Sequence, residues 1–134
     1  MDLNLAKEIR FYSGKEVRDA LVMADRILHG RKRDHWNVYG GYFIALFLLC
    51  MGFKKISSSE SLPVVTMSEV KDFLSKPVDE QKEFLLNVSM IYMPDAVYDE
   101  IYDILQKALN TQPKECESCV QSALEGFNEF FGNN

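Results

Sequence analysis

Two cysteines near the carboxyl end of the chain have the spacing of a metal-binding or redox motif. Cys116 and Cys119 form a C-x-x-C sequence, and residues three positions apart share one face of a helix. A zinc site would need two more soft ligands, and the candidates Cys50, His29 and His35 form no paired motif. A redox motif normally lies beside a strand–helix–strand unit, and the sequence predicts no strands. Structural thiols, a disulfide, half of a metal site and a redox pair all stay open, and we expect structural thiols with no metal or cofactor.

The two histidines are candidates for a general base. Such a base needs a side chain that orients it and a nucleophile that it activates. Asp25 lies one helical turn before His29, but no serine or cysteine is placed nearby to be activated. The chain also has no glycine-rich phosphate loop, because Gly40-Gly41 lacks the lysine and the spacing of that motif. We therefore expect a protein that is not an enzyme.

A basic turn followed by a tryptophan has residue types that bind nucleic acid. Its residues are Arg31, Lys32, Arg33 and Trp36. Cationic side chains neutralise phosphates, and an indole ring can stack on a base. Three cations with Asp34 beside them make a small footprint in a chain that is acidic overall. A solvated loop anchored by Trp36 is the simpler interpretation of this turn.

Tyrosine and aspartate alternate around Pro94 and suggest a partner-binding face. The six candidate residues are Tyr92, Asp95, Tyr98, Asp99, Tyr102 and Asp103. The aspartates are four residues apart, so a helix would align them at a cost of roughly a few tenths of a kcal/mol per pair. A basic partner would remove that cost, and tyrosine is enriched at protein interfaces. The competing interpretation is a half-buried helix face with phenol groups at its boundary.

The charge of the chain is unevenly distributed. The 134 residues carry a net charge of −5; residues 1–36 contain eight Lys and Arg against six Asp and Glu, and residues 37–134 contain seven against fourteen. An acidic surface repels nucleic-acid backbones and attracts basic partners. Three cysteines are an odd number for a fully disulfide-bonded domain, and no signal-peptide pattern opens the sequence. We expect a cytoplasmic protein.

The elements that must position these residues are predicted to be helices. Residues 38–53 contain no charge and no proline. As a helix they would span about 24 Å, less than the roughly 30 Å of a bilayer core. We therefore expect a buried central helix and no membrane association, with a membrane segment and a strand as the alternatives. A helix that is apolar all round must be covered on every side.

Apolar spacing and capping signals predict the covering helices. They are expected over residues 2–11, from Ser13 to about His29, from Thr66 to Leu74, from Pro77 through Ile91, over 95–110, and from Thr111 and Pro113 to near the end. Capping boxes are predicted at Ser13–Glu16 and Thr66–Glu69, Ile91 is expected on a buried face, and residues 54–65 are expected to form a loop. The predicted fold is one all-α domain, residues 1–134, of six to seven helices around 38–53.

Three functional classes fit these observations. The leading hypothesis is a non-catalytic protein-binding module, of the immunity-protein or phage anti-defence type, that inhibits by covering a basic surface with the acidic, tyrosine-bearing face. A nuclease or another nucleic-acid-handling complex is the kind of partner expected. The alternative is a small nucleic-acid-associated subunit that uses the basic turn at 31–33, and the third class is a metal- or redox-dependent protein that uses the C-x-x-C pair.

Overall fold

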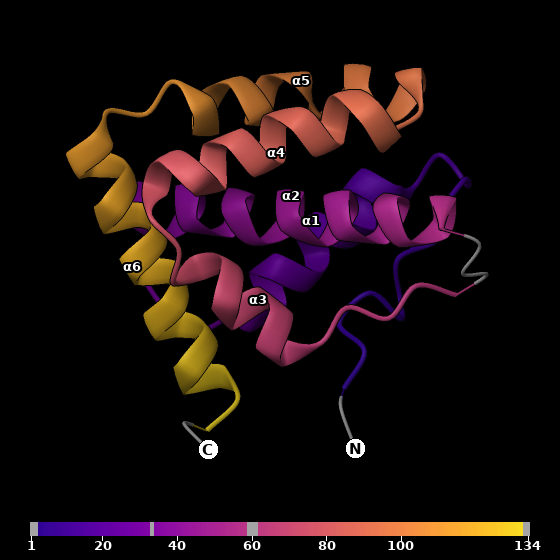
Figure 1. Cartoon of the computed structure of the whole chain (residues 1–134). Coiled ribbons are helices and arrows are strands. Elements are labelled where there is room, and N and C mark those ends of the chain that lie inside the picture. Colours follow the sequence, from indigo (N-terminus) through magenta and orange to yellow (C-terminus); the bar gives the residue numbers. More distant parts are fainter. Residues whose placement is uncertain (1–2, 33, 59–61, 133–134) are drawn as a thin grey trace.

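The computed structural model describes residues 3–32, 34–58 and 62–132. Within these ranges the chain forms six α-helices and no strand. They are α1 (Glu16–Ile27), α2 (His35–Ser57), α3 (Met67–Leu74), α4 (Val78–Tyr92), α5 (Asp95–Leu109) and α6 (Pro113–Phe130). The predicted all-α bundle is confirmed, and Figure 1 shows its arrangement.

The apolar segment 38–53 lies within α2, the central helix of the bundle. Every residue from 43 to 50 is buried, and α2 packs against α1, α3, α4, α5 and α6. The helix is longer than expected because Asp34 caps its start by accepting a hydrogen bond from the Asn37 amide at 3.0 Å. At its other end Lys55 stays helical while its ammonium reaches out to Glu69 on α3 at 2.9 Å.

Among the described residues, α2 is the one helix long and apolar enough to cross a membrane, as judged by length and composition. Its most apolar 18-residue window has a mean hydropathy of 1.5, and 67% of that window is buried within the bundle. The core helix of a bundle passes the same test of length and composition. In this fold the neighbouring helices bury most of the apolar window of α2.

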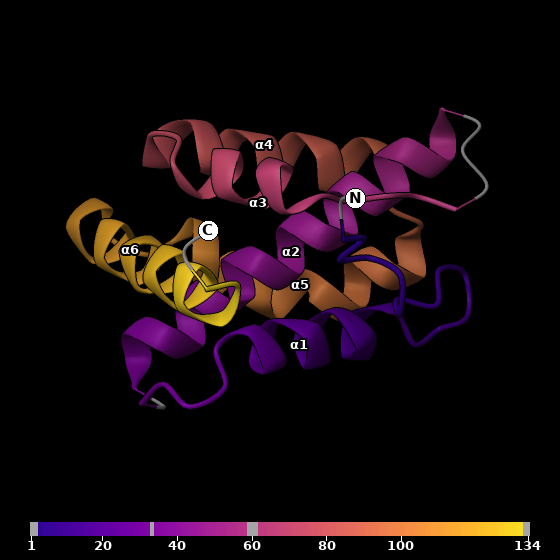
Figure 2. The same ribbon diagram turned by 90° about the horizontal axis from the view of Figure 1, so that it is seen from below.

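The other helices cover α2 from different sides, as the two perpendicular views show (Figures 1 and 2). The antiparallel pair α4 and α5 forms one layer over α2, and α1 and α3 lie on other sides of it. α6 crosses the first half of α2 at very short range, since a Cβ placed on Gly40 would lie 2.6 Å from the Cys119 carbonyl oxygen. The glycine makes this close crossing of two backbones feasible.

The helix predicted over residues 2–11 does not form in the part that the structure describes. Residues 3–14 run as turns and irregular chain, although Leu5 and Ile9 are buried as expected. Polar groups of this segment form hydrogen bonds with Val65 instead of within a helix. The Leu5 amide donates to the Val65 carbonyl at 2.9 Å, and the Asn4 side chain accepts from the Val65 amide at 3.0 Å. A positive φ of 81° at Gly14 then turns the chain into α1.

Only one of the two predicted capping boxes is present. At α3 the Thr66 hydroxyl accepts from the Glu69 amide at 3.2 Å, and Glu69 accepts from the Thr66 amide at 2.9 Å. At α1 the prediction is wrong, because the Ser13 hydroxyl donates to the Arg10 carbonyl and accepts from the Lys15 amide at 3.1 Å. Lys15 is therefore the cap residue, without a capping side-chain hydrogen bond.

Candidate functional site

The α4–α5 hairpin carries a charge as large as that of the whole chain. Residues 78–110 contain seven acidic and two basic residues, a net charge of −5, which equals the net charge of all 134 residues. The remainder of the chain is therefore balanced. Most of the acidic excess noted in the sequence therefore lies on one two-helix layer on the outside of the bundle (Figure 1), and residues 111–134 carry a further −3.

Both cations of this hairpin are occupied by contacts within the molecule. The Lys82 ammonium donates to the Thr111 carbonyl at 2.7 Å, and the Lys107 ammonium pairs with Asp103 at 3.0 Å. Asp95 and Asp99 are exposed and have no ion-pair partner within the described ranges. Two of the three predicted aspartates therefore keep an unneutralised charge.

The three predicted tyrosines differ in how much of each ring is accessible. Tyr102 is 52% exposed, whereas Tyr92 and Tyr98 are half-buried and pack against the core. The rings of Tyr98 and Tyr102 lie 6.3 Å apart. A partner would contact chiefly Tyr102. The rings of Tyr92 and Tyr98 also pack against the core, as in the competing interpretation of a half-buried helix face.

The two flanks of α5 face different neighbours. Glu100 lines a groove with α1 and α2. The pKa of Lys107 is raised by its hydrogen bond to Asp103 and further by the nearby phenols of Tyr42 and Tyr39 on α2. Residues seven positions apart lie on one side of a helix, so Glu100 and Lys107 mark the flank toward α2. Tyr102 lies about halfway around the helix from them, on the flank toward α4.

The two flanks of α4 are distinguished in the same way. Lys82 reaches Thr111, which follows α5, so Lys82 and Leu86, one turn later, lie on the side toward α5. Met90 lies about halfway around the helix from the buried Gln81 and Val88, so it points outward. Phe84 contacts Phe73 on α3, with ring centroids 5.7 Å apart. Ile91, seven residues after Phe84, therefore lies on the α3 side.

Apolar side chains on α4 are exposed where the sequence analysis did not place them. Ile91, expected in the core, is 69% exposed, because it lies beyond the edge of the buried stripe. Met90 is 65% and Leu86 37% exposed. We call the outer surface of the two helices on this side the seam face, and it consists of Leu86, Met90, Asp95, Asp99 and Tyr102. Asp103, predicted with them, pairs with Lys107 and lies closer to the flank toward α2. The four-residue spacing of Leu86 and Met90 outside the buried stripe is the sequence signal for them.

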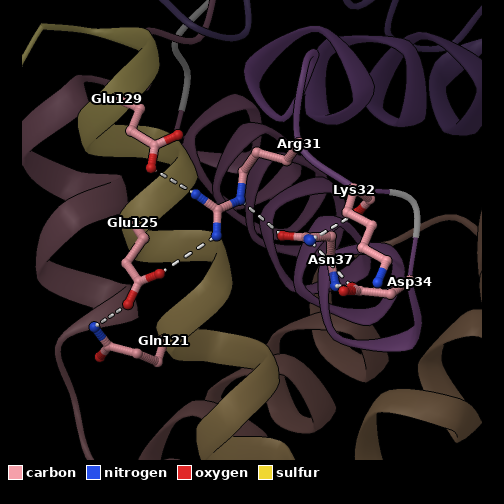
Figure 3. A network of polar contacts seen from close by, with 7 residues as sticks. All are labelled: Arg31, Lys32, Asp34, Asn37, Gln121, Glu125 and Glu129. Atoms are coloured by element: carbon pink, nitrogen blue, oxygen red, sulfur yellow. Dashed lines mark hydrogen bonds and ion pairs between the residues drawn. The ribbon is translucent and has the colours of Figure 1, made fainter.

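The basic turn is held by an internal network, shown in Figure 3. The Arg31 guanidinium donates to Glu129 at 2.8 Å, to Glu125 at 3.3 Å and to the Asn37 side chain at 2.9 Å, and its side chain is only 18% exposed. All three of its nitrogen atoms are therefore used in joining the α1–α2 connection to α6. This leaves Arg31 poorly placed to neutralise a phosphate.

The other residues of that turn are not gathered into one cationic surface. Lys32 is exposed, Arg33 lies outside the described residues, and Trp36 is 46% exposed with its ring edge-to-face against His35. His35 also pairs with Glu115 on α6. Among the described residues of this turn, only Lys32 and the Trp36 ring are therefore available for the nucleic-acid alternative.

A groove of about 570 Å³ lies beside this turn, between α1, the start of α2 and α5. Its floor includes Val17, Leu21, Leu28 and Val38, and its polar lining includes Arg18, Asp25, Lys32 and Glu100. Because the lining carries charges of both signs, the groove does not favour a ligand of one charge.

The cysteines are buried free thiols. Cys116 and Cys119 are not bonded to each other, and both are fully buried where α6 meets the bundle. Burial raises the pKa of the Cys119 thiol to about 11 and raises that of Cys116 as well. An activated cysteine has a lowered pKa, so these thiols have the opposite property. No group of three His, Cys, Asp or Glu suited to hold a metal ion occurs in the described part of the chain.

Comparison with family models, with curated proteins and with solved structures finds no match for this chain.

Proposed function

We propose that this protein is a non-catalytic binding module whose α4–α5 hairpin docks on a basic surface of a partner protein. The observation that carries the proposal is the coincidence on one layer of the hairpin's net charge of −5 with exposed Leu86, Met90 and Tyr102. Exposed apolar side chains gathered at one place indicate an interaction site, and the surrounding charge selects the sign of the partner.

The mechanism of such a module is occlusion. The acidic hairpin attracts a basic surface over several ångströms and speeds the encounter. Once the surfaces meet, burial of Tyr102 and the two apolar residues of α4 slows dissociation. A channel that handles nucleic acid is basic because it binds phosphates. Inhibition of a nuclease or a similar complex, as an immunity protein or an anti-defence protein would perform it, is the activity that we propose.

The test is affinity capture from a lysate of the host cells with three purified proteins. The first is the wild type. The second, Asp99→Lys with Tyr102→Ala, changes two exposed residues of the seam face. The third, Asp72→Lys with Val64→Ala, changes the same charge and removes an exposed apolar side chain outside the hairpin. Tyr98 is left intact, because it packs against the core and its loss would disturb folding.

We expect the wild type and the third protein to retain the same basic partner and the seam-face variant to lose it. Thermal unfolding of all three should be alike, since the changed side chains are exposed. Retention should also weaken as salt rises, because exposed charges are screened. If the seam-face variant retains what the wild type retains, the hairpin is not the binding surface and the proposal is wrong.

A further inference from the structure

We infer that the element which occupies the seam face is a basic amphipathic α-helix of the partner, lying along α4 and α5. This inference rests on the proposed function and specifies the form of the partner. The helix would carry a line of apolar residues beside a line of Lys or Arg, each repeating every three to four residues.

The apolar part of the seam face has the geometry that a helix can meet. Leu86 and Met90 are one helical turn apart, Leu86 on the side of α4 toward α5 and Met90 pointing outward, and the exposed Tyr102 lies on the flank of α5 toward α4. These side chains form a short strip along the two helix axes. An amphipathic helix recognises such a strip with residues at positions i, i+3, i+4 and i+7. A peptide that binds by adding a β-strand would need an open strand edge, and the described residues contain no strand.

The charged part of the seam face has the same repeat. Asp95, Asp99 and Asp103 are four residues apart on α5, so their carboxylates follow one another at roughly 6 Å. Asp103 is already paired with Lys107 at 3.0 Å, so a partner helix with a cation every four residues would pair with Asp95 and Asp99 in register. Since α4 and α5 each have 15 residues, the layer is about 22 Å long and accommodates a helix of about fifteen residues.

Charge argues against the other occupants. Nucleic acid and anionic lipid surfaces carry phosphates, which the acidic hairpin repels. A second copy of this chain, joined by a twofold axis through the seam face, would bring two copies of the same acidic hairpin together. Asp95 and Asp99 have no ion-pair partner in the described structure, and each hairpin carries a net charge of −5, so two such faces would repel each other.

The test uses two fluorescent 15-residue peptides of identical leucine and lysine content. In the first, leucine and lysine lines lie side by side on a helix; in the second, the order is scrambled so that no apolar line forms. Anisotropy at low salt measures binding to the wild type, Met90→Gln and Ile91→Gln. The last two replace neighbouring side chains of similar exposure, 65% and 69%, of which Met90 belongs to the seam face and Ile91 lies on the α3 side.

We expect the amphipathic peptide to bind the wild type about tenfold more tightly than the scrambled peptide does. Met90→Gln should weaken that binding about fivefold or more, as truncation of a central interface residue does, and Ile91→Gln should leave it within about twofold. A second matched pair tests the charge: Asp99→Lys should weaken binding more than Glu100→Lys, which makes the same change on the flank toward α2.

Three results would overturn the inference: equal binding of both peptides, equal effects of the Met90 and Ile91 changes, or no binding of the amphipathic peptide. Sedimentation of the free protein adds a fourth, because a dimer that Met90→Gln disrupts would make a second copy the occupant. Each of these leaves the capture experiment unaffected. Hairpin-dependent capture without peptide binding would keep the proposed function and reject the helix.

Discussion

Two adjacent glycines of α2 offer the sharpest test of the packing described above. A Cβ on Gly40 would lie 2.6 Å from the Cys119 carbonyl oxygen and 3.0 Å from the Ala123 Cβ, both on α6. A Cβ on Gly41 would lie 3.5 Å from the nearest atom, a terminal methyl of Leu28, which is an ordinary contact. The same substitution by alanine at these two positions should therefore have effects of opposite sign.

The magnitudes follow from two opposing terms. Alanine is favoured over glycine inside a helix by about 1 kcal/mol, and this gain applies to both positions. At Gly40 the obstacle is backbone, which cannot rotate away, so α6 must shift. Overpacking costs about 1–3 kcal/mol, and a clash with backbone places this cost in the upper part of that range, at about 2–3 kcal/mol. We expect Gly40→Ala to lower the free energy of unfolding by about 1–2 kcal/mol and Gly41→Ala to raise it by up to about 1 kcal/mol.

Denaturant and thermal unfolding of the two variants beside the wild type measure these differences. For a chain of this size each kcal/mol corresponds to roughly 3–5 °C in Tm. The two variants should fall on opposite sides of the wild type. A Gly40→Ala protein as stable as the wild type, or a Gly41→Ala protein less stable than it, would refute the close crossing of α2 and α6.

Three further predictions concern the polar and sulfur groups. Arg31→Ala should lower the free energy of unfolding by about 1–2 kcal/mol in denaturant titrations, because it removes three hydrogen bonds, two of them to carboxylates. Cys116 and Cys119 should resist alkylation at pH 8 in the native protein and react at once in denaturant, because burial raises the pKa of both thiols. Burial raises the pKa of Glu69, but hydrogen bonds from Lys55 and the capping amide outweigh it and leave the pKa below 4.5. The stability that this carboxylate contributes is thus complete above pH 4.5 and lost as pH falls through the lower folded value, so the advantage of wild type over Glu69→Gln should shrink there.

The sequence predicts most of this fold because local signals and packing agree along most of the chain. The uncharged run at 38–53 predicts a covered helix, and the Thr66–Glu69 box marks the start of α3 as predicted. The prediction of a helix over residues 2–11 is wrong because Asn4 and Leu5 form hydrogen bonds with residues about sixty positions away, at 63–65. No local pattern encodes a partner at that distance.

The candidate surface could be predicted only in part. The spacing of Asp95, Asp99 and Asp103 identifies an acidic line on one helix without the structure. Which flank of α5 faces α4 depends on how the two helices are rotated, and that is set by buried residues such as Leu85 and Ile101. The prediction that Ile91 is buried is wrong for the same reason, since a residue at the edge of the apolar stripe is buried only if a neighbouring helix covers it.

The central position of α2 has a consequence for how the chain is made. Its cover comes partly from α6, which ends at Phe130, about seventy residues after α2 ends at Ser57. At 5–20 residues per second a ribosome needs about 4–15 s to supply that length. Throughout that interval α2, with its uncharged stretch at 38–53, lacks the cover that the completed α6 provides. Chaperones and the membrane-targeting machinery, which bind exposed apolar segments of emerging chains, would therefore have access to α2 before α6 covers it.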